Sequence, residues 1–462
     1  MSPRKIILLI FVLALLLRGY PLFIGSMTGP DPWFHARMAE MVVEGQAVPT
    51  YDELSMQGRF YSYAPLYHTT IATFSIASSI DVLSLTPILP LIYGAMAVFL
   101  VFAFAKRFFK SDSIALFAAL AIAIMPLHLM RSASYARPDT LALLLVPTVI
   151  FLIYINRFKL AGLLTVALAL LHPLSALYLF LFLIVWMVIA RISRTEFKFR
   201  NTVLLILIGT LVWLLWLYSL PYSPAEYVSM VSFESAENAK PLILSIAVLF
   251  TFSWIFAAIG IAKIKARENI FLLSWFGFSF LYAAFSMRLA IFLTIPMAIL
   301  ASFGFGVVFE KTRKFAPILF LILFVLSSMV LYNEVQGAGW FISPPERSAI
   351  SWMSSLPDET VIACRWDRGH PITYLSGKPV VMDGYFEFAP GLDERNKSMS
   401  AIPYISNCDR LLAEQQKWGF THFFVPSRSF GLPAFTNGLL AADCNFISQP
   451  FSGSHARILE FG

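Results

Sequence analysis

Long apolar runs separated by short polar stretches fill the first 333 residues of the chain. The first run, 6–24, follows a short basic N-terminus and is long enough to cross the ~30 Å hydrocarbon core of a bilayer. No small-residue cleavage site is obvious there, which favours a membrane helix over a signal peptide. Further runs occur at 85–105, 114–129, 140–155, 160–171, 174–190, 203–220, 242–262, 270–285, 289–308 and 318–332. The pattern predicts a polytopic α-helical membrane protein of about 11 to 13 spans.

Two segments depart from this pattern. Residues 51–67 are polar and aromatic and 65–83 are only moderately apolar, so we expect an outer loop with an interfacial helix. From 333 onward the composition is that of a soluble protein, with helices expected at 345–356 and 409–418 and strands at 360–364, 379–382, 422–425 and 457–461. We therefore predict a membrane domain over 1–333 and a small α/β domain over 334–462.

The composition of the whole chain agrees with a membrane protein. Hydrophobic residues make up 58%, charged residues make up 13%, and the mean hydropathy is +0.73, which excludes a soluble globular protein. The net charge of +7 is also found in nucleic-acid-binding proteins, but here Lys and Arg lie in short clusters between apolar runs. The positive-inside rule assigns these clusters to the cytoplasm. We therefore expect no nucleic-acid partner, and we place the C-terminal domain on the extracytoplasmic side of the cell membrane.

All three cysteines lie in the C-terminal domain. Cys364, Cys408 and Cys444 lack the close pairing of a zinc site. The chain therefore has at most one disulfide, and one thiol is left over.

A dense polar and aromatic segment, G-P-D-P-W-F-H-A-R over Gly29–Arg37, begins directly after the first span. Asp31 stands before a proline there. One interpretation is a helix N-cap, with Pro32 at the first helical position. The other is a metal-binding or catalytic carboxylate at the membrane surface.

The predicted topology brings further charges to the membrane face of Asp31. They are Asp139 between the third and fourth spans, Glu237 in a later loop and Arg288 at the outer end of a span. Charges near spans are costly, so their convergence indicates a functional site. Carboxylates suit Mg²⁺ or Mn²⁺, and an arginine suits a phosphate. Structural alternatives are a helix cap at Asp139, a solvated loop face at Glu237 and a snorkelling side chain at Arg288.

These motifs resemble those of the catalytic subunit of oligosaccharyltransferase, a C-type membrane glycosyltransferase. D-P-W-F-H-A-R resembles the first acidic motif of that family, D-P-W-[FY]-[HN]-x-R. The other motifs follow in the family's order, as R-S-A-S-Y-A-R-P-D-T (131–140), E-S-A-E-N-A-K-P (234–241), M-R-L-A-I-F (287–292) and a segment beginning R-W-D-R-G (365–384). The resemblance therefore extends over nearly the whole chain.

The resemblance implies that a glycan moves from a polyprenyl-phosphate lipid to an asparagine of a protein. In this scheme Asp31 is both a metal ligand and the residue that orients the acceptor nucleophile. Glu237 completes the acceptor side, and Arg288 meets the donor phosphate. The cofactor is Mn²⁺ or Mg²⁺, with Asp139 as a second ligand. The partners are a polyprenyl-phosphate-linked glycan, an acceptor protein or glycan, and membrane lipids.

The chain departs from the family in two of these motifs. Leu141 stands where the family has a further metal-binding residue, so a third ligand would be His35, His128 or a water.

In the family, W-W-D-Y-G reads the Ser or Thr of the acceptor sequon. The chain keeps Trp366, Asp367 and Gly369 of this motif, but Arg365 and Arg368 replace an aromatic pair. Trp366 and Asp367 are thus candidates for acceptor binding. A lipid or growing glycan is an alternative acceptor. An alternative of another class is a transporter or a non-catalytic scaffold, although transporters place polar groups near the bilayer midplane.

Overall fold

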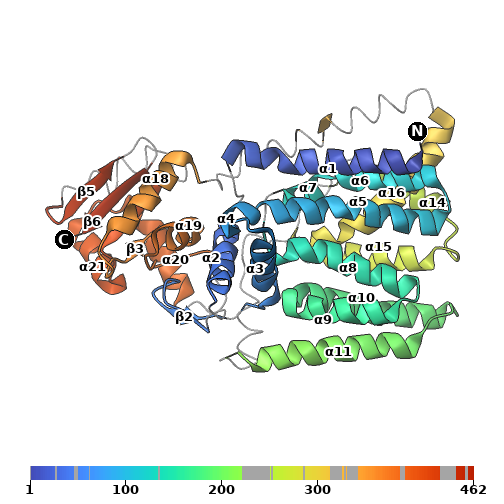
Figure 1. Cartoon of the computed structure of the whole chain (residues 1–462), viewed down its shortest axis with the longest axis horizontal. Helices are drawn as coiled ribbons and strands as arrows, with labels where there is room; N and C mark the ends of the chain where they lie inside the picture. The colour runs from blue at the N-terminus through green and yellow to red at the C-terminus, as the bar shows by residue number, and fades with distance from the viewer. Residues whose placement is uncertain are drawn as a thin grey trace.

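The computed structural model describes residues 2–25, 29–45, 50–61, 63–133, 136–220, 253–284, 287–312, 342–385, 391–426, 444–452 and 456–461, together with single positions at 250, 325, 326 and 329. A bundle of long helices forms one part of the molecule, and an α/β unit built from the C-terminal residues stands at one end of it (Figure 1). The bundle contains α1 (Pro3–Gly25), α5 (Ile88–Phe109), α6 (Asp112–Ile124), α7 (Pro126–Ser132), α8 (Pro138–Tyr154), α9 (Phe158–Leu171), α10 (Pro173–Ile192), α11 (Phe199–Tyr218), α14 (Ser253–Lys263), α15 (Ile270–Ala283), the 3₁₀ segment η2 (Met287–Leu293) and α16 (Thr294–Thr312).

The helices of the bundle are those of an integral membrane protein. Within the described residues, five helices are long and apolar enough to cross a membrane, and α6 with α7 makes a sixth candidate that bends by 57° at a break. Four shorter apolar helices, α8, α9, α14 and α15, accompany them. Most of the predicted span at 318–332 lies outside the described residues. The count of about 11 to 13 spans therefore stays a prediction.

The basic connections gather at the end of the bundle away from the α/β unit. Figure 1 shows the N-terminus, the end of α5 and the connections α8–α9 and α10–α11 at that end. Arg191 in the last turn of α10 and Arg194 and Lys198 in the α10–α11 connection lie there. With the positive-inside rule, this arrangement predicts that the α/β unit is extracytoplasmic.

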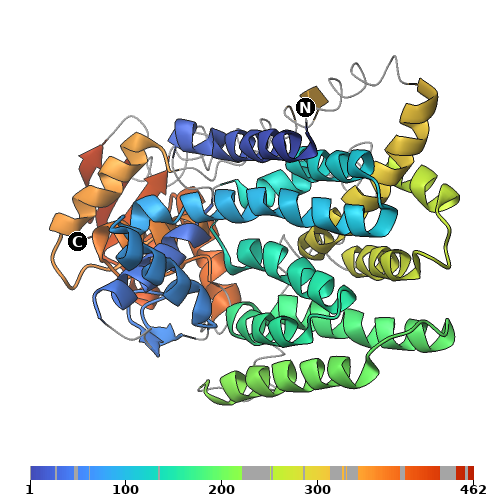
Figure 2. The same ribbon diagram turned by 45° about the vertical axis from the view of Figure 1, so that its right-hand side comes forward.

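Two helices and a short hairpin lie between the bundle and the α/β unit. In Figures 1 and 2, α2 (Asp31–Val43) and α3 (Leu66–Ser78) run across the direction of the long helices. The short helix α4 (Val82–Leu85) leads into α5, and β1 (Tyr51–Asp52) pairs antiparallel with β2 (Arg59–Phe60). A helix is thus present where an interfacial one was predicted.

The α/β unit is built on a four-stranded sheet of order β3-β4-β6-β5, in which only the β3–β4 pair is parallel. The predicted strands at 360–364, 422–425 and 457–461 correspond to β3, β4 and β6, whereas 379–382 contributes one isolated bridge at Val380. Strand β5 was not predicted. The elements are α18 (Pro344–Trp352), η3 (Met353–Ser355), β3 (Ile362–Ala363), α19 (Trp366–Ser376), α20 (Leu392–Ala401), η4 (Ile402–Tyr404), α21 (Cys408–Trp418), β4 (His422–Pro426), β5 (Ile447–Ser452) and β6 (Ala456–Phe461).

Two sequence expectations about this unit are confirmed. The predicted helix at 409–418 is α21, which ends at Gly419 in the left-handed conformation, with φ of 61°. Cys408 and Cys444 form the one disulfide with a Cα–Cα distance of 5.6 Å, and the thiol left over is the buried Cys364.

Helices α14 and α16 pack closely because glycines face each other. A Cβ at Gly304 would lie 1.9 Å from the carbonyl oxygen of Phe256, and one at Gly260 would lie 2.4 Å from that of Leu300. We expect Gly304→Ala to force the helices apart and to lower the free energy of unfolding by about 1–3 kcal/mol. The thermal unfolding midpoint in detergent measures this loss. In the control Gly277→Ala, the new methyl group meets no atom within 4 Å. An equal loss in both variants would contradict the packing argument.

Candidate active site

Asp31 begins α2 without capping it. The N-cap residue is Pro30, no side chain makes a cap hydrogen bond, and Pro32 occupies the first turn. The N-cap interpretation of Asp31 is therefore wrong. The positive end of the helix dipole stabilises the carboxylate in this position. Its side chain is 25% exposed, so it remains accessible to a substrate.

Asp139 lies in the first turn of α8 and shares a partner with Asp31. The cap interpretation fails here too, because the N-cap residue is Arg137 and no side-chain cap bond is present. The Nε atom of Arg137 lies 3.2 Å from Oδ2 of Asp31 and 3.7 Å from Oδ1 of Asp139. Arg137 and Asp139 are nearly buried, with side chains 6% and 3% exposed. The structure thus brings the two predicted acids together around a guanidinium that sequence reasoning missed.

Local chemistry explains why Arg137 has this place. A residue before proline is confined to extended backbone, and Arg137 has φ −139° and ψ 157° ahead of Pro138. The N–H of Thr140 donates to the carbonyl of Arg137, which closes the first turn of α8. The R-P-D-T sequence therefore places the guanidinium and the Asp139 carboxylate on either side of one proline.

His35, one helical turn after Asp31, is engaged elsewhere. Its Nδ1 lies 2.8 Å from Nε2 of His68, whose Nδ1 lies 2.9 Å from the hydroxyl of Tyr61. His128, another possible ligand, lies 2.7 Å from a guanidinium nitrogen of Arg18. His35 and His128 thus each have a protein partner at one ring nitrogen.

The described residues do not form the Mn²⁺ or Mg²⁺ site that the motif resemblance implies. They contain no group of three or more His, Cys, Asp and Glu side chains placed to hold a metal ion. Asp31 and Asp139 already enclose the Arg137 cation, and Leu141 offers no ligand atom. The set of Asp31, Asp139 and His35 is therefore not assembled as a metal centre in this part of the chain.

The α/β unit forms a wall of the site. A Cβ at Gly384 would lie 3.6 Å from Oδ1 of Asp31 and 3.4 Å from the ring of His370, so a larger residue would crowd the carboxylate. On α19, the ring of His370 lies 5.1 Å from that of Phe34 on α2. The α/β unit is thus in contact with the helix that carries Asp31.

A cluster of buried polar residues joins the α/β unit to the loop around the β1–β2 hairpin. Arg59 lies 3.7 Å from Asp383 and 4.0 Å above the ring of Tyr385, and it also donates to the carbonyl of Tyr385. Ser55 donates to the Asp383 carboxylate. These contacts join residues more than 300 positions apart, with separations of 326 and 328 for the two hydrogen bonds.

His370 gives this region a pH dependence. Burial lowers the pKa of His370 from 6.5 to about 4. The folded protein thus excludes a proton that the unfolded chain binds, and the free energy of unfolding should fall as the pH drops from 6.5 towards 4. One such histidine contributes up to about 1.4 kcal/mol per pH unit.

We expect His370→Gln to reduce this slope, measured as the thermal midpoint at a series of pH values. His422→Gln is the comparison variant: burial lowers the pKa of His422 as well, but the charge of Glu460 opposes that shift, so we expect a smaller reduction of the slope. A slope that is unchanged in His370→Gln would contradict the assignment to His370.

Asp367 is held inside the α/β unit. Its Oδ1 accepts from Nε of Arg365 at 3.2 Å, and its Oδ2 accepts from Arg368 at 3.0 Å. Arg368 also pairs with the buried Glu346 at 3.3 Å. Trp366 packs against the apolar core of the same unit. Both carboxylate oxygens of this predicted acceptor-binding residue are therefore ion-paired.

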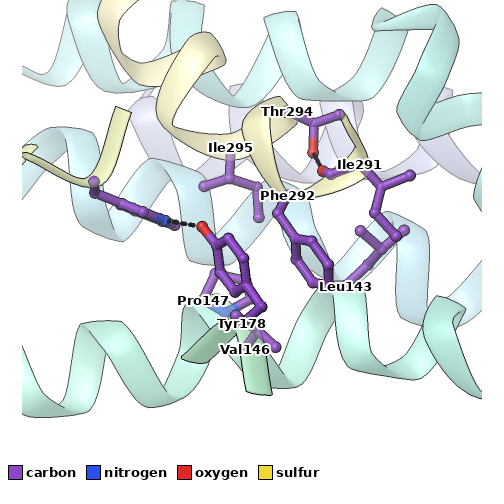
Figure 3. A pocket seen from close by; sticks show the side chains of 9 residues that line it. Leu143, Val146, Pro147, Tyr178, Ile291, Phe292, Thr294 and Ile295 are labelled. Carbon is purple, nitrogen blue, oxygen red and sulfur yellow. Dashed lines mark hydrogen bonds between the residues drawn. The ribbon is translucent and has the colours of Figure 1, made fainter. Parts of the chain in front are cut away.

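Of the other predicted site residues, Glu237 and the side chain of Arg288 lie outside the described residues. The backbone of Arg288 belongs to η2, which packs beside α8. Ile291 of η2 and Leu143, one turn after Asp139, line the same small apolar pocket (Figure 3). The segment with Arg288 thus lies next to the helix that carries Asp139.

One lining residue of the pocket in Figure 3, Tyr178, carries a polar group. The hydroxyl of Tyr178 accepts from Nε1 of Trp275 at 3.0 Å and lies 2.6 Å from the hydroxyl of Ser279. The ring of Tyr178 stacks on Phe292 with centroids 4.1 Å apart. These contacts fix η2 against α10 and α15.

No protein-family model and no curated protein matches the chain. Solved structures do. The oligosaccharyltransferase of Archaeoglobus fulgidus tethered with an acceptor peptide has a TM-score of 0.70 and 14% identity, over 100% of this chain and 74% of that chain. ArnT from Cupriavidus metallidurans bound to undecaprenyl phosphate has a TM-score of 0.64 and 12% identity, over 98% and 97%. The mycobacterial arabinofuranosyltransferase AftD has a TM-score of 0.57 and 11% identity, over 100% and 40%.

The Archaeoglobus enzyme has also been solved with an inhibitory peptide and a dolichol-phosphate, and with Zn and sulfate. All three neighbours are C-type membrane glycosyltransferases. Because the sequence identities are only 11–14%, the structural similarity shows a shared fold and nothing more. The chain therefore has the fold of the C-type membrane glycosyltransferases.

Proposed function

We propose that this chain is a membrane glycosyltransferase that moves a glycan from a polyprenyl-phosphate carrier to an acceptor at the extracytoplasmic surface. The observation that carries the proposal is the pairing of Asp31 and Asp139 through Arg137, where the bundle meets the α/β unit. Structural neighbours with this fold bind dolichol-phosphate or undecaprenyl phosphate, which supports a donor of that class.

The chemistry assigned to the site is a displacement at the anomeric carbon of the donor. A nucleophilic atom of the acceptor bonds to that carbon while the bond from the carbon to the phosphate oxygen breaks. The electron pair leaves with the phosphate, and the acceptor proton passes to Asp31. Positive groups stabilise the charge that grows on the phosphate. We assign this task to Arg288, and we assign Glu237 to the acceptor side.

Asp31 suits the role of proton acceptor because of its surroundings. It is the more exposed of the two acids, at 25% against 3% for Asp139, so an acceptor can reach it. Arg137 holds the Asp31 carboxylate in position through the contact at 3.2 Å. Asp139 then serves to hold Arg137 in place.

Two classes of acceptor follow from different observations. The motif resemblance favours an asparagine of a protein, with Trp366 and Asp367 binding the acceptor. The ion pairs of Asp367 with Arg365 and Arg368 favour a lipid or a growing glycan as acceptor. To bind Asp367, the Ser or Thr hydroxyl of a protein sequon would have to displace one of these arginines.

The test is transfer by the purified full chain in lipid nanodiscs. A labelled polyprenyl-phosphate-linked glycan is offered with an Asn-x-Thr peptide in one arm and with a lipid or glycan acceptor in the other. Label on the peptide supports the protein acceptor, and label only on the lipid or glycan supports the alternative. Donor that stays intact in both arms, across several glycans and carriers, contradicts the proposal and favours a transporter or scaffold.

A further inference from the structure

Arg137 occupies the place between two acids where the motif resemblance calls for a metal ion. Its Nε lies within 4 Å of both carboxylates, at 3.2 Å from Asp31 and 3.7 Å from Asp139. The guanidinium is nearly buried and keeps its proton in proteins. The acid pair therefore already has a permanent positive partner.

A divalent ion bound to the same two acids would compete with that partner. Mg²⁺ binds oxygen ligands at about 2.1 Å, so an ion held by both carboxylates would lie close to the guanidinium. Two positive charges at such separation repel each other strongly in a site with little water. Leu141 supplies no ligand to offset this repulsion, and the ring of His35 is paired with His68.

We propose that Arg137 takes the place of the divalent cation, so that transfer proceeds without added metal. Arg137 positions Asp31 for proton transfer and places a positive charge beside the leaving phosphate. Arginine suits both tasks, because its planar N–H groups match carboxylate and phosphate oxygens. The inference rests on the proposed function and deepens it. No metal, oxidant or further reactant enters the displacement described above.

The first test measures metal binding and does not depend on turnover. Mn²⁺ is titrated into the full chain in nanodiscs, with bound ion followed by electron paramagnetic resonance. We expect no saturable site in the wild type and one site in Arg137→Ala, where the two acids lose their cation. The Arg137→Ala/Asp31→Asn double variant should lose that site again. Saturable binding to the wild type that Asp31→Asn removes would overturn the inference, as would absence of binding to Arg137→Ala.

The second test measures transfer with EDTA and with Mn²⁺. The wild-type protein should transfer at the same rate in EDTA and in Mn²⁺. In EDTA, Arg137→Ala should transfer at least ~10-fold more slowly than the wild type. Mn²⁺ should restore part of the rate of Arg137→Ala. Arg137→Lys keeps the charge and should remain insensitive to EDTA. Arg107→Ala, an exposed arginine at the opposite end of the bundle, is the control for loss of a positive charge. Wild-type transfer that stops in EDTA would overturn the inference.

The two tests separate this inference from the proposed function. If no donor supports transfer, the proposed function fails, while the Mn²⁺ titration still decides whether Arg137 excludes a metal ion. If Arg137→Ala does not fold, as judged by its thermal midpoint, Arg137→Gln serves in its place because it keeps the side-chain length. A wild-type rate in folded Arg137→Ala or Arg137→Gln would overturn the assignment.

Discussion

Replacing Asp31 by asparagine is expected to lower the transfer rate by ~1,000-fold, the size of effect that general base catalysis commonly has. Asparagine has nearly the same shape, so α2 should still begin at this residue, because Asp31 makes no cap hydrogen bond that the change would remove. The amide oxygen still accepts from Arg137 at the 3.2 Å position. What the variant loses is the negative charge and the ability to take up the acceptor proton.

The measurement is the initial rate of glycan transfer at saturating donor, together with the thermal midpoint of each protein. Asp112→Asn is the matched control. Asp112 also lies in the first turn of a helix, α6, but its side chain is 45% exposed and pairs with Lys106 at 2.8 Å, at the cytoplasmic end predicted from charge. A folded Asp31→Asn protein that transfers at the wild-type rate would remove Asp31 from the mechanism.

The bundle was predictable because its signal is local. An apolar run long enough to span a bilayer is visible in the chain itself, and α1, α5 and α10 lie where the runs at 6–24, 85–105 and 174–190 place them. The bend between α6 and α7 was not predicted within the run 114–129, although Pro126 marks its position. Pro126 lacks the N–H that would continue the helix ladder.

The sequence singled out Asp31 and Asp139, but it did not predict which residues they contact. Asp31 and Asp139 stand in motifs with flanking prolines, whereas the pairing of Asp31 with Arg137 links positions 106 residues apart. A contact of this kind depends on how α2 meets α8. Arg137 belongs to the R-P-D-T motif that the sequence analysis identified. However, no local sequence rule predicts which carboxylate a guanidinium will pair with.

The contribution of the α/β unit was visible only in part. The segment 365–384 was singled out for Trp366 and Asp367, yet its contacts with α2 are made by other residues, among them His370, Tyr374 and Gly384. The difference arises because Arg365 and Arg368 hold Asp367 within the unit. Sequence alone gives the charges of such a cluster and leaves its pairing open.

Arg18→Met is expected to lower the free energy of unfolding by about 3–5 kcal/mol or to prevent folding, because it leaves a buried polar network without its donor. Arg18 is fully buried within α1. Its guanidinium donates to the hydroxyl of Ser132 at 2.8 Å and to the carbonyls of Ala123 at 3.2 Å and Ile122 at 3.4 Å. The carbonyl of Ile122 would bond to the N–H of residue 126 in a continuous helix, and Pro126 has none.

Arg18 therefore supplies the donors that the break between α6 and α7 removes, and no water replaces them inside a bilayer. Gly94 leaves room for this contact, since a Cβ there would lie 2.6 Å from Nε of Arg18, so Gly94→Ala should also destabilise the protein. The thermal midpoint in detergent and the yield of monodisperse protein are the measurements. Arg191→Met, an exposed arginine in the last turn of α10, should stay within about 0.5 kcal/mol of the wild type. A wild-type midpoint in Arg18→Met would show that the broken helix satisfies its carbonyls without Arg18.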